Sequence, residues 1–129
     1  MREILFRGKR RDNSEWSYGS LQCFKGYSIF DTIWKNFITV NSKTVGQYIG
    51  LTDKNGVKIF EDDICKFREW NRGDMCWIGK VVYEHQQFVI SGGPNEECDT
   101  PFILQMSRFI PENIEIIGNI HDNPELLKE

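Results

Sequence analysis

The chain has 129 residues, a formal net charge of −3 and a hydrophobic fraction of 40%, with nine Phe, four Trp and four Tyr. This composition excludes a disordered chain, because large apolar side chains are plentiful. The small negative charge excludes binding to nucleic acid over the whole surface, which needs a strongly basic domain.

Length and apolar patterning predict one compact domain with two lobes. No apolar run approaches the ~20 residues of a membrane-spanning helix, and the first apolar run is too short for a signal peptide. The four cysteines are scattered without a Cys-x-x-Cys pair, which favours reduced thiols over a zinc site. We therefore expect a cytoplasmic protein with no cofactor and no membrane contact.

The first lobe, residues 1–43, is expected to be an antiparallel β structure. Residues 3–21 predict a hairpin, because a short apolar run is followed by a polar turn and then by alternation that puts Trp16 and Tyr18 on one face. Residues 27–30 and 36–40 are rich in β-branched and aromatic side chains and predict two further strands.

The second lobe, residues 44–129, is expected to be a small SH3-like β-barrel that ends in a short helix. Asn55-Gly56 lies between apolar runs and predicts a hairpin. Pro124 suits the first residue of the terminal helix and Asn123 its N-cap. Further strands are expected at residues 63–67, 81–83, 88–90, 102–104 and 114–120. The long acidic loop 91–101 is a candidate for partner contact.

Four carboxylates lie close together in the sequence: Asp53, Glu61, Asp62 and Asp63. Such a group can hold Mg²⁺ or serve as acid and base, which defines one hypothesis, a metal-dependent hydrolase acting through Asp53, Asp62 and Asp63. The alternative is turn chemistry, since Asp side chains bond nearby backbone N–H groups. The positions at strand ends favour the turn interpretation.

Two other reactive groups support catalysis poorly. Cys65 lies between Ile64 and Phe67, which favours a buried thiol over a nucleophile. His121 has no strained nucleophile motif to serve and is expected at the surface. We therefore expect no enzymatic activity.

The basic group at the predicted hairpin turn is the main nucleic-acid candidate. It consists of Arg7, Lys9, Arg10 and Arg11. Trp16 lies nearby, and basic side chains beside stacking aromatics are a known solution for binding single strands. The alternative is an ordinary solvated turn, which the local charge density favours.

Trp70 and Trp77 lie in or beside the polar segment 68–77. Exposed aromatics are enriched at protein interfaces, so both are candidate binding residues. The alternative, equally weighted, is that they fold back onto the second lobe.

Several motifs together resemble the YopX family of bacteriophage and prophage proteins. The matching segments are Phe6-Arg7-Gly8-Lys9, Trp16 with Tyr18-Gly19-Ser20-Leu21, Thr44-Val45-Gly46-Gln47-Tyr48, Gly50-Leu51-Thr52-Asp53-Lys54-Asn55-Gly56, Ile59-Phe60-Glu61 with Asp63-Ile64, Gly79 with Val81, Ile116-Ile117-Gly118-Asn119-Ile120, and Asn123-Pro124-Glu125-Leu126-Leu127. The resemblance implies a phage-type, mainly β protein without an established molecular role, and it supplies no catalytic residues.

One position departs from the family pattern, which commonly has Gly where this chain has Asp62. If that Gly serves a turn with positive φ, Asp62 must adopt the same conformation. The leading functional hypothesis is a non-catalytic scaffold that binds a protein partner or a second copy of itself. Nucleic-acid binding is the second hypothesis and the metal-dependent hydrolase the third.

Overall fold

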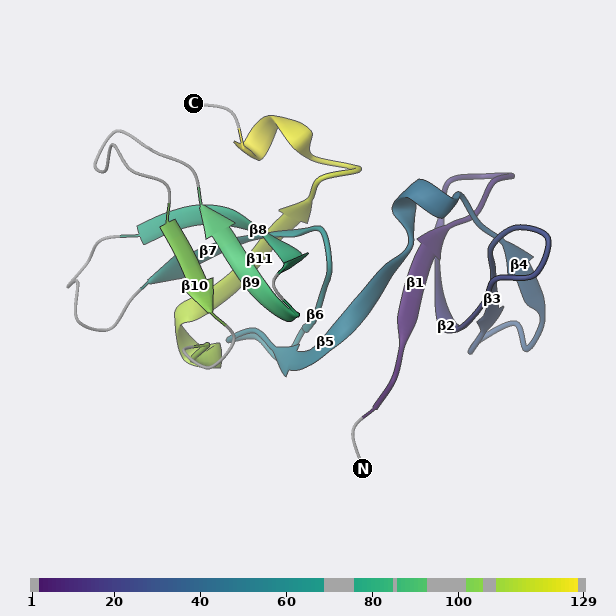
Figure 1. Ribbon diagram of the computed structural model, residues 1–129, viewed down its shortest axis with the longest axis horizontal. Helices are drawn as coiled ribbons and strands as arrows, with labels where there is room; N and C mark the ends of the chain where they lie inside the picture. Colours follow the sequence, from purple (N-terminus) through teal and green to yellow (C-terminus); the bar gives the residue numbers. More distant parts are fainter. Residues whose placement is uncertain (1–2, 69–75, 85, 93–101, 106–108, 128–129) are drawn as a thin grey trace. The chain divides into compact units, whose positions relative to one another are not determined.

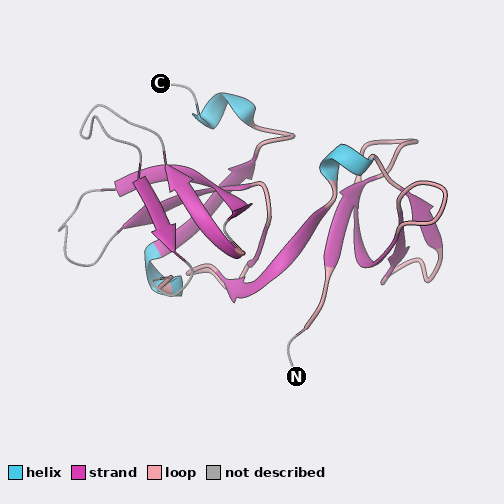
Figure 2. Ribbon diagram, viewed as in Figure 1, coloured by secondary structure: helices cyan, strands magenta, loops and turns pink. Residues whose placement is uncertain are grey.

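Strands form most of this protein (Figures 1 and 2). The computed structural model describes residues 3–68, 76–84, 86–92, 102–105 and 109–127. The chain folds as two compact units, Met1–Gly50 (unit 1) and Leu51–Glu129 (unit 2). The predicted mainly β class is confirmed, because the described strands form two antiparallel sheets and the short helices are single 3₁₀ turns.

Unit 1 holds the first strands of a six-stranded sheet with the order β4-β3-β2-β1-β5-β6. Its elements are β1 (Phe6–Lys9), β2 (Trp16–Gln22), β3 (Ser28–Asp31), β4 (Phe37–Thr39), the 3₁₀ helix η1 (Ser42–Thr44) and most of β5 (Gly46–Thr52). Each strand pairs antiparallel with its neighbour in sequence as far as β4. The predicted first hairpin and the strands near residues 27–30 and 36–40 are therefore confirmed.

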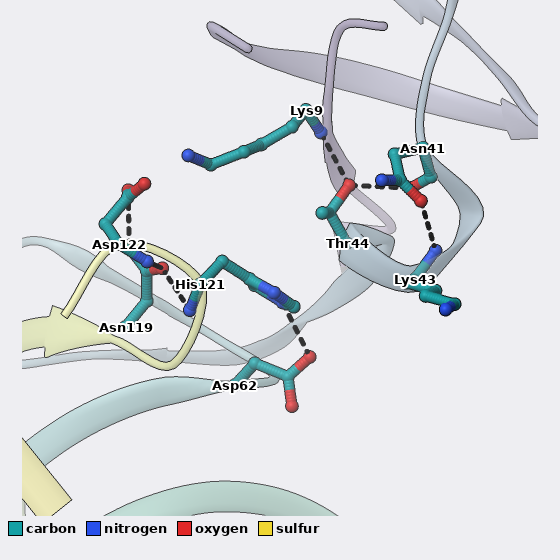
Figure 3. Close-up of polar contacts among 8 residues, drawn as sticks. All are labelled: Lys9, Asn41, Lys43, Thr44, Asp62, Asn119, His121 and Asp122. Atoms are coloured by element: carbon teal, nitrogen blue, oxygen red, sulfur yellow. Dashed lines mark hydrogen bonds and ion pairs between the residues drawn. The ribbon is translucent and has the colours of Figure 1, made fainter. Parts of the chain in front are cut away.

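The segment after β4 returns the chain to β1. Arg10 and Val40 form an isolated antiparallel bridge, and the Asn41 N–H donates to the Lys9 carbonyl at 2.8 Å. The Lys9 N–H donates to Thr44 Oγ1 at 2.8 Å (Figure 3). Because β5 then pairs with β1, the division between the units falls at Gly50, whereas the sequence places it between residues 43 and 44.

Unit 2 contains a five-stranded antiparallel sheet with the order β10-β9-β8-β7-β11. Its elements are β6 (Lys58–Phe60), β7 (Asp63–Arg68), β8 (Cys76–Glu84), β9 (Gln87–Gly92), β10 (Phe102–Gln105), η4 (Pro111–Asn113), β11 (Ile114–Asn119) and η5 (Pro124–Leu127). β6 belongs to the six-stranded sheet, next to β5.

The sheet of unit 2 is open, with β10 and β11 as its two edges, so the predicted barrel is not closed by the described strands. The predicted terminal helix is a single 3₁₀ turn, and the Asn123 side chain accepts a hydrogen bond from the Asn119 N–H behind it. Among the described residues, no helix has the length and apolar character needed to cross a membrane. The predicted loop 91–101 falls mostly outside the described part of the chain.

The two units differ in what they bury. The inward face of the unit 2 sheet carries large apolar side chains that are almost fully buried, among them Phe67, Trp77, Val81, Ile90 and Leu104. In the described part of unit 1, the buried set on β2 and β3 is small and partly polar, with Ile29 beside Ser17 and Asp31. Most of the aromatic side chains of that unit therefore lie outside this buried set, and the exposed ones define the candidate site.

Candidate functional site

The predicted basic group does not form an open cationic surface. Arg7 is buried, and its guanidinium carbon lies 4.4 Å from the centre of the Trp16 ring. The Lys9 ammonium lies 5.4 Å from the same centre. These cation–π contacts arise because Arg7 and Lys9 share a sheet face with Trp16, which stands directly opposite Lys9 in the strand register. The Trp16 ring is thus packed against cations of its own chain.

Arg10 is paired locally. Its Nε donates to Asp12 Oδ1 at 3.0 Å and its Nη2 to Asp12 Oδ2 at 2.8 Å. This hydrogen-bonded pair raises the pKa of Arg10 and lowers the pKa of Asp12. Of the four predicted basic residues, Arg11 is the one that is exposed, so the hairpin presents neither four solvated charges nor four cations open to a nucleic acid.

Of the two candidate tryptophans in the second lobe, the structure describes one. Trp77 is only 2% exposed and stacks on Phe67, with ring centroids 6.1 Å apart and an interplanar angle of 22°. It therefore folds back onto the sheet, and its proposed role as an exposed binding residue is wrong. The physical reason is its place on the inward face of β8, opposite Phe67 in the register. Trp70 lies outside the described residues.

The carboxylates near the Asn55-Gly56 turn bind backbone. Asp53 Oδ1 accepts from the N–H groups of Asn55 and Val57 at 2.9 and 3.0 Å. Asp53 Oδ2 accepts from the Ile116 N–H at 3.0 Å, which joins the turn to β11. Asp63 Oδ2 accepts from the Phe60 N–H at 2.8 Å and closes the β6–β7 turn. The turn-chemistry interpretation of Asp53 and Asp63 is therefore confirmed.

Asp62 has φ of 71°, so it adopts the left-handed conformation that its place in the family pattern predicts. Its Oδ2 lies 3.3 Å from His121 Nε2 (Figure 3). Asn119 organises the neighbouring turn, because its Oδ1 accepts from the N–H groups of both His121 and Asp122.

No group of three or more His, Cys, Asp or Glu side chains suited to a metal ion occurs among the residues that the structure describes. Burial raises the pKa of the Cys65 thiol far above its usual range, which opposes a nucleophilic thiolate.

Asp53→Asn is expected to lower the free energy of unfolding by about 2 kcal/mol. The new amide NH₂ faces an N–H donor wherever it is placed, so at least one part-buried backbone N–H loses its acceptor. Urea unfolding measures the loss, and Glu125→Gln, the same charge change at an exposed side chain, is the control. Equal stability of the two variants would contradict the structural role of Asp53.

A different surface emerges in unit 1, where half of the exposed large hydrophobic side chains in the described part of the chain fall within residues 18–37. We call this set the apolar surface of unit 1. Its members are Tyr18, Phe24, Tyr27, Phe30, Ile33, Trp34 and Phe37. These residues lie on the paired strands β2, β3 and β4 and on the loops that join them, and exposed apolar groups gathered in one region are typical of a contact surface for another molecule.

The strand register explains part of this surface. Phe30 on β3 stands opposite Phe37 on β4, and the two rings pack edge to face with centroids 5.0 Å apart. Ser17 and Gly19 on β2 are buried, whereas Tyr18 between them is exposed. The aromatic rings on these strands therefore point away from the buried set formed by Ile29, Ser17 and Asp31.

The turn between β3 and β4 is held by one buried carboxylate. Asp31 Oδ1 accepts from the N–H groups of Ile33 and Trp34, both at 2.8 Å. Asp31 Oδ2 accepts from Ser17 Oγ at 2.6 Å. The main chain closes the same turn, because the Lys35 N–H donates to the Asp31 carbonyl. Ile33 and Trp34 are nevertheless 81% and 69% exposed, so an ordered turn presents two large apolar side chains to solvent.

Sequence reasoning missed this surface, because the apolar runs at residues 27–30 and 36–40 predicted strands without indicating which of their side chains face solvent. A signal was present, since Phe30 is followed by Asp31, and a carboxylate next to an apolar run suggests a turn with bonds to its backbone. Tyr18 also lies between two small residues, Ser17 and Gly19, that leave little to bury on the opposite face. Neither signal could reveal that Ser17 would meet Asp31 across 14 residues.

The two units carry opposite formal charge. Unit 1 has eight Lys and Arg against four Asp and Glu, which gives +4, and unit 2 has eight against fifteen, which gives −7. Between residues 16 and 50 the single carboxylate is Asp31, which is buried, whereas Lys25, Lys35 and Lys43 are exposed. The apolar surface of unit 1 therefore lies in a segment that shows positive charge alone to solvent.

The comparisons with known proteins agree with the resemblance. Among solved structures, the chain is similar to the crystal structure of protein EF1440 from Enterococcus faecalis, with 24% identity and a TM-score of 0.53 over 99% of this chain and 100% of that one. At this identity the likeness shows a shared fold alone. No curated protein matches the chain. The YopX family, described as YopX protein, matches residues 5–128, so the chain belongs to the YopX family.

Proposed function

We propose that this chain is a non-catalytic interaction module that holds a protein partner through the apolar surface of unit 1. The observation that carries the proposal is the turn held by Asp31, which presents Ile33 and Trp34 to solvent in an ordered conformation. Trp is enriched among the residues that dominate binding energy at interfaces. An ordered turn also binds at a lower entropic cost than a flexible loop, because its conformation is already restricted.

The manner of binding follows from the edge of the sheet. β4 ends unit 1's part of the sheet, but the Phe37 N–H donates to Asn36 Oδ1 at 2.9 Å and the Thr39 carbonyl accepts from the Arg11 N–H at 3.2 Å. These polar groups, which a partner strand would use, already have partners within the chain. Recognition through side chains is therefore favoured over the addition of a strand.

The competing hypotheses have less support. The nucleic-acid hypothesis relied on four basic residues. Arg7 and Lys9 contact Trp16 and Arg10 pairs with Asp12, which leaves Arg11 as the exposed member of the set. The hydrolase hypothesis relied on carboxylates that hold turns. The phage origin, the cytoplasmic location and the SH3-like character of the second half stay predictions. Binding through unit 1 requires none of the three.

The test compares wild-type protein with the double variant Ile33→Ser, Trp34→Ala as bait in affinity capture, together with sizing by light scattering. We expect a protein partner, or a second copy of the chain, to be held by the wild type and lost from the variant. Because both side chains are exposed, the variant should fold and unfold like the wild type. Val57→Ser, at an exposed position on a turn of unit 2, is the matched control and should keep the partner.

If the wild type and the double variant are both monomeric and recover the same proteins, the proposed function is wrong. Partner loss in Val57→Ser as well would indicate a contact outside the apolar surface of unit 1, and would equally contradict it.

A further inference from the structure

We propose that the partner of the apolar surface of unit 1 is an acidic protein segment that carries large apolar side chains. This inference rests on the proposed function and adds the chemistry of the occupant. It depends on three features of unit 1: the positive charge of the segment that carries the surface, the conformation of two lysines, and the extent of the surface along β3.

Charge complementarity is the first feature. Segment 16–50 exposes Lys25, Lys35 and Lys43, and its one carboxylate, Asp31, is only 6% exposed and is engaged by Ser17 and the turn backbone. A ligand on the apolar surface therefore meets these cations at the rim, whereas the exposed carboxylates of the unit, Glu3, Asp12 and Glu15, lie before this segment in the chain. Rim charges of one sign speed association with a partner of the opposite sign and exclude partners of the same sign.

The backbone conformation of two of these lysines is the second feature. Lys25 and Lys35 have φ of 52° and 55°, in the left-handed region that favours Gly and Asn. Each follows an exposed apolar residue directly, Phe24 in one loop and Trp34 in the other. Local backbone preference therefore does not account for lysine at either position. A requirement for positive charge beside the apolar side chains accounts for lysine at both positions.

The extent of the surface is the third feature and decides between classes of partner. Phe24 and Lys25 precede β3, whereas Trp34 and Lys35 follow it, so the two loops flank a strand of four residues that spans about 13 Å. The exposed Phe30 ring lies on the strand between them. This arrangement fits a segment lying along the face. The segments that lie flat on a bilayer surface are amphipathic helices, and the described part of unit 1 has no helix longer than one 3₁₀ turn.

Single-stranded nucleic acid fits less well than an acidic protein. Base stacking uses the flat faces of aromatic rings, but Phe30 and Phe37 pack edge to face against each other. The most exposed member of the surface is Ile33, which offers no ring to a base but fits an apolar pocket on a protein. Lysines at the two ends of β3 are also few for a groove that tracks a phosphate backbone.

The test selects random 12-residue peptides displayed on phage against the intact chain, and measures binding of the synthesised winners by fluorescence anisotropy. We expect the winners to be enriched in Asp, Glu and large apolar residues. Their affinity should fall about tenfold between 50 mM and 500 mM salt, because the electrostatic part is screened. Trp34→Ala should abolish binding.

The decisive variant is Lys25→Asn, Lys35→Asn. Asn tolerates the left-handed conformation better than Lys, so this variant should unfold at an equal or higher urea concentration than the wild type. Its affinity for the winners should nevertheless fall about tenfold at 50 mM salt, mainly through a slower association rate. Lys58→Asn, at an exposed lysine on β6, is the control and should bind like the wild type.

Each other result has a clear meaning. The selected peptides could instead be neutral or basic, bind independently of salt and still require Trp34. That result would overturn the acidic partner but leave the proposed function standing. Selection that yields no peptide dependent on Trp34 contradicts both. Sedimentation with phosphatidylglycerol vesicles that is lost in Trp34→Ala would assign the surface to a membrane. Binding of a 20-nucleotide single strand that is lost in Trp34→Ala would assign it to nucleic acid. Either result overturns the acidic protein partner.

Discussion

Asp31→Ala is expected to lower the free energy of unfolding of unit 1 by about 3 kcal/mol. The carboxylate receives one buried hydroxyl, from Ser17, and the N–H groups of Ile33 and Trp34. Hydrogen bonds to a charged group contribute about 1.5–3 kcal/mol each, but the two N–H groups at the turn regain water when the carboxylate is lost. The buried hydroxyl does not, and it supplies the largest part of the cost.

Hydrogen exchange followed by mass spectrometry measures this loss for unit 1 separately, because peptides from residues 28–40 report on the turn and β3. The amides of Ile33 and Trp34 should exchange faster in the variant, and binding through the apolar surface of unit 1 should weaken. Asp12→Ala is the matched control, since Asp12 is an exposed aspartate of the same unit whose bonds are to the Arg10 side chain. Unchanged protection of residues 28–40 in Asp31→Ala would contradict the role assigned to this carboxylate.

The stabilisation by Asp31 depends on pH with a defined sign. Burial raises the pKa of Asp31, but the hydrogen bonds from Ser17 and the turn backbone outweigh it, so the pKa lies below the ordinary value of 3.8. A group with a lowered folded pKa stabilises the protein above its ordinary value and loses that contribution as the pH falls through the lower folded value. The difference between wild type and Asp31→Ala should therefore be largest at neutral pH and shrink below pH 3.8.

Trp77→Ala is expected to lower the free energy of unfolding by about 4 kcal/mol. Trp77 fills the inward face of the unit 2 sheet against Phe67, and removing the indole leaves a cavity that the neighbouring strands cannot fill. Replacement of a buried aromatic side chain by Ala costs about 3–5 kcal/mol for this reason. Urea unfolding followed by circular dichroism measures the loss.

Trp34→Ala makes the same chemical change at an exposed position and is the control for stability. It should leave the urea midpoint of the protein unchanged while removing partner binding. Trp77→Ala should lower the urea midpoint but keep partner binding under conditions in which the protein remains folded. If Trp77→Ala were as stable as the wild type, Trp77 would not be a core residue, and its original assignment as an exposed binding side chain would return.

Local patterns in the sequence predicted the strands well. The period-two alternation around Trp16 and the Asn55-Gly56 pair led to β1–β2 and β5–β6, and Gly56 takes φ of 80° as such a turn requires. The positive φ of Asp62 followed from the resemblance to the family. These features depend on neighbours a few residues apart, so the sequence contains what determines them.

The candidate site was harder to predict, because its residues are ordinary core formers by composition. The sequence did not indicate whether Phe30, Ile33 and Trp34 face the core or solvent, which is decided where β2 brings Ser17 beside Asp31. The basic hairpin differed from its prediction. Arg7 and Lys9 read as solvated charges, but the register of β1 and β2 places them against Trp16.

By itself, the sequence determined that this is a mainly β chain of the YopX family, where its turns fall, and that Asp53 and Asp63 serve those turns. These properties arise mainly from side chains acting on nearby backbone, although the bond from the Ile116 N–H to Asp53 needs the tertiary structure. Only the tertiary structure decided which aromatics face the core, because burial depends on strand register and on which strand lies opposite. Trp77 lies inward against Phe67, whereas Trp34 lies outward on a turn that a buried carboxylate holds.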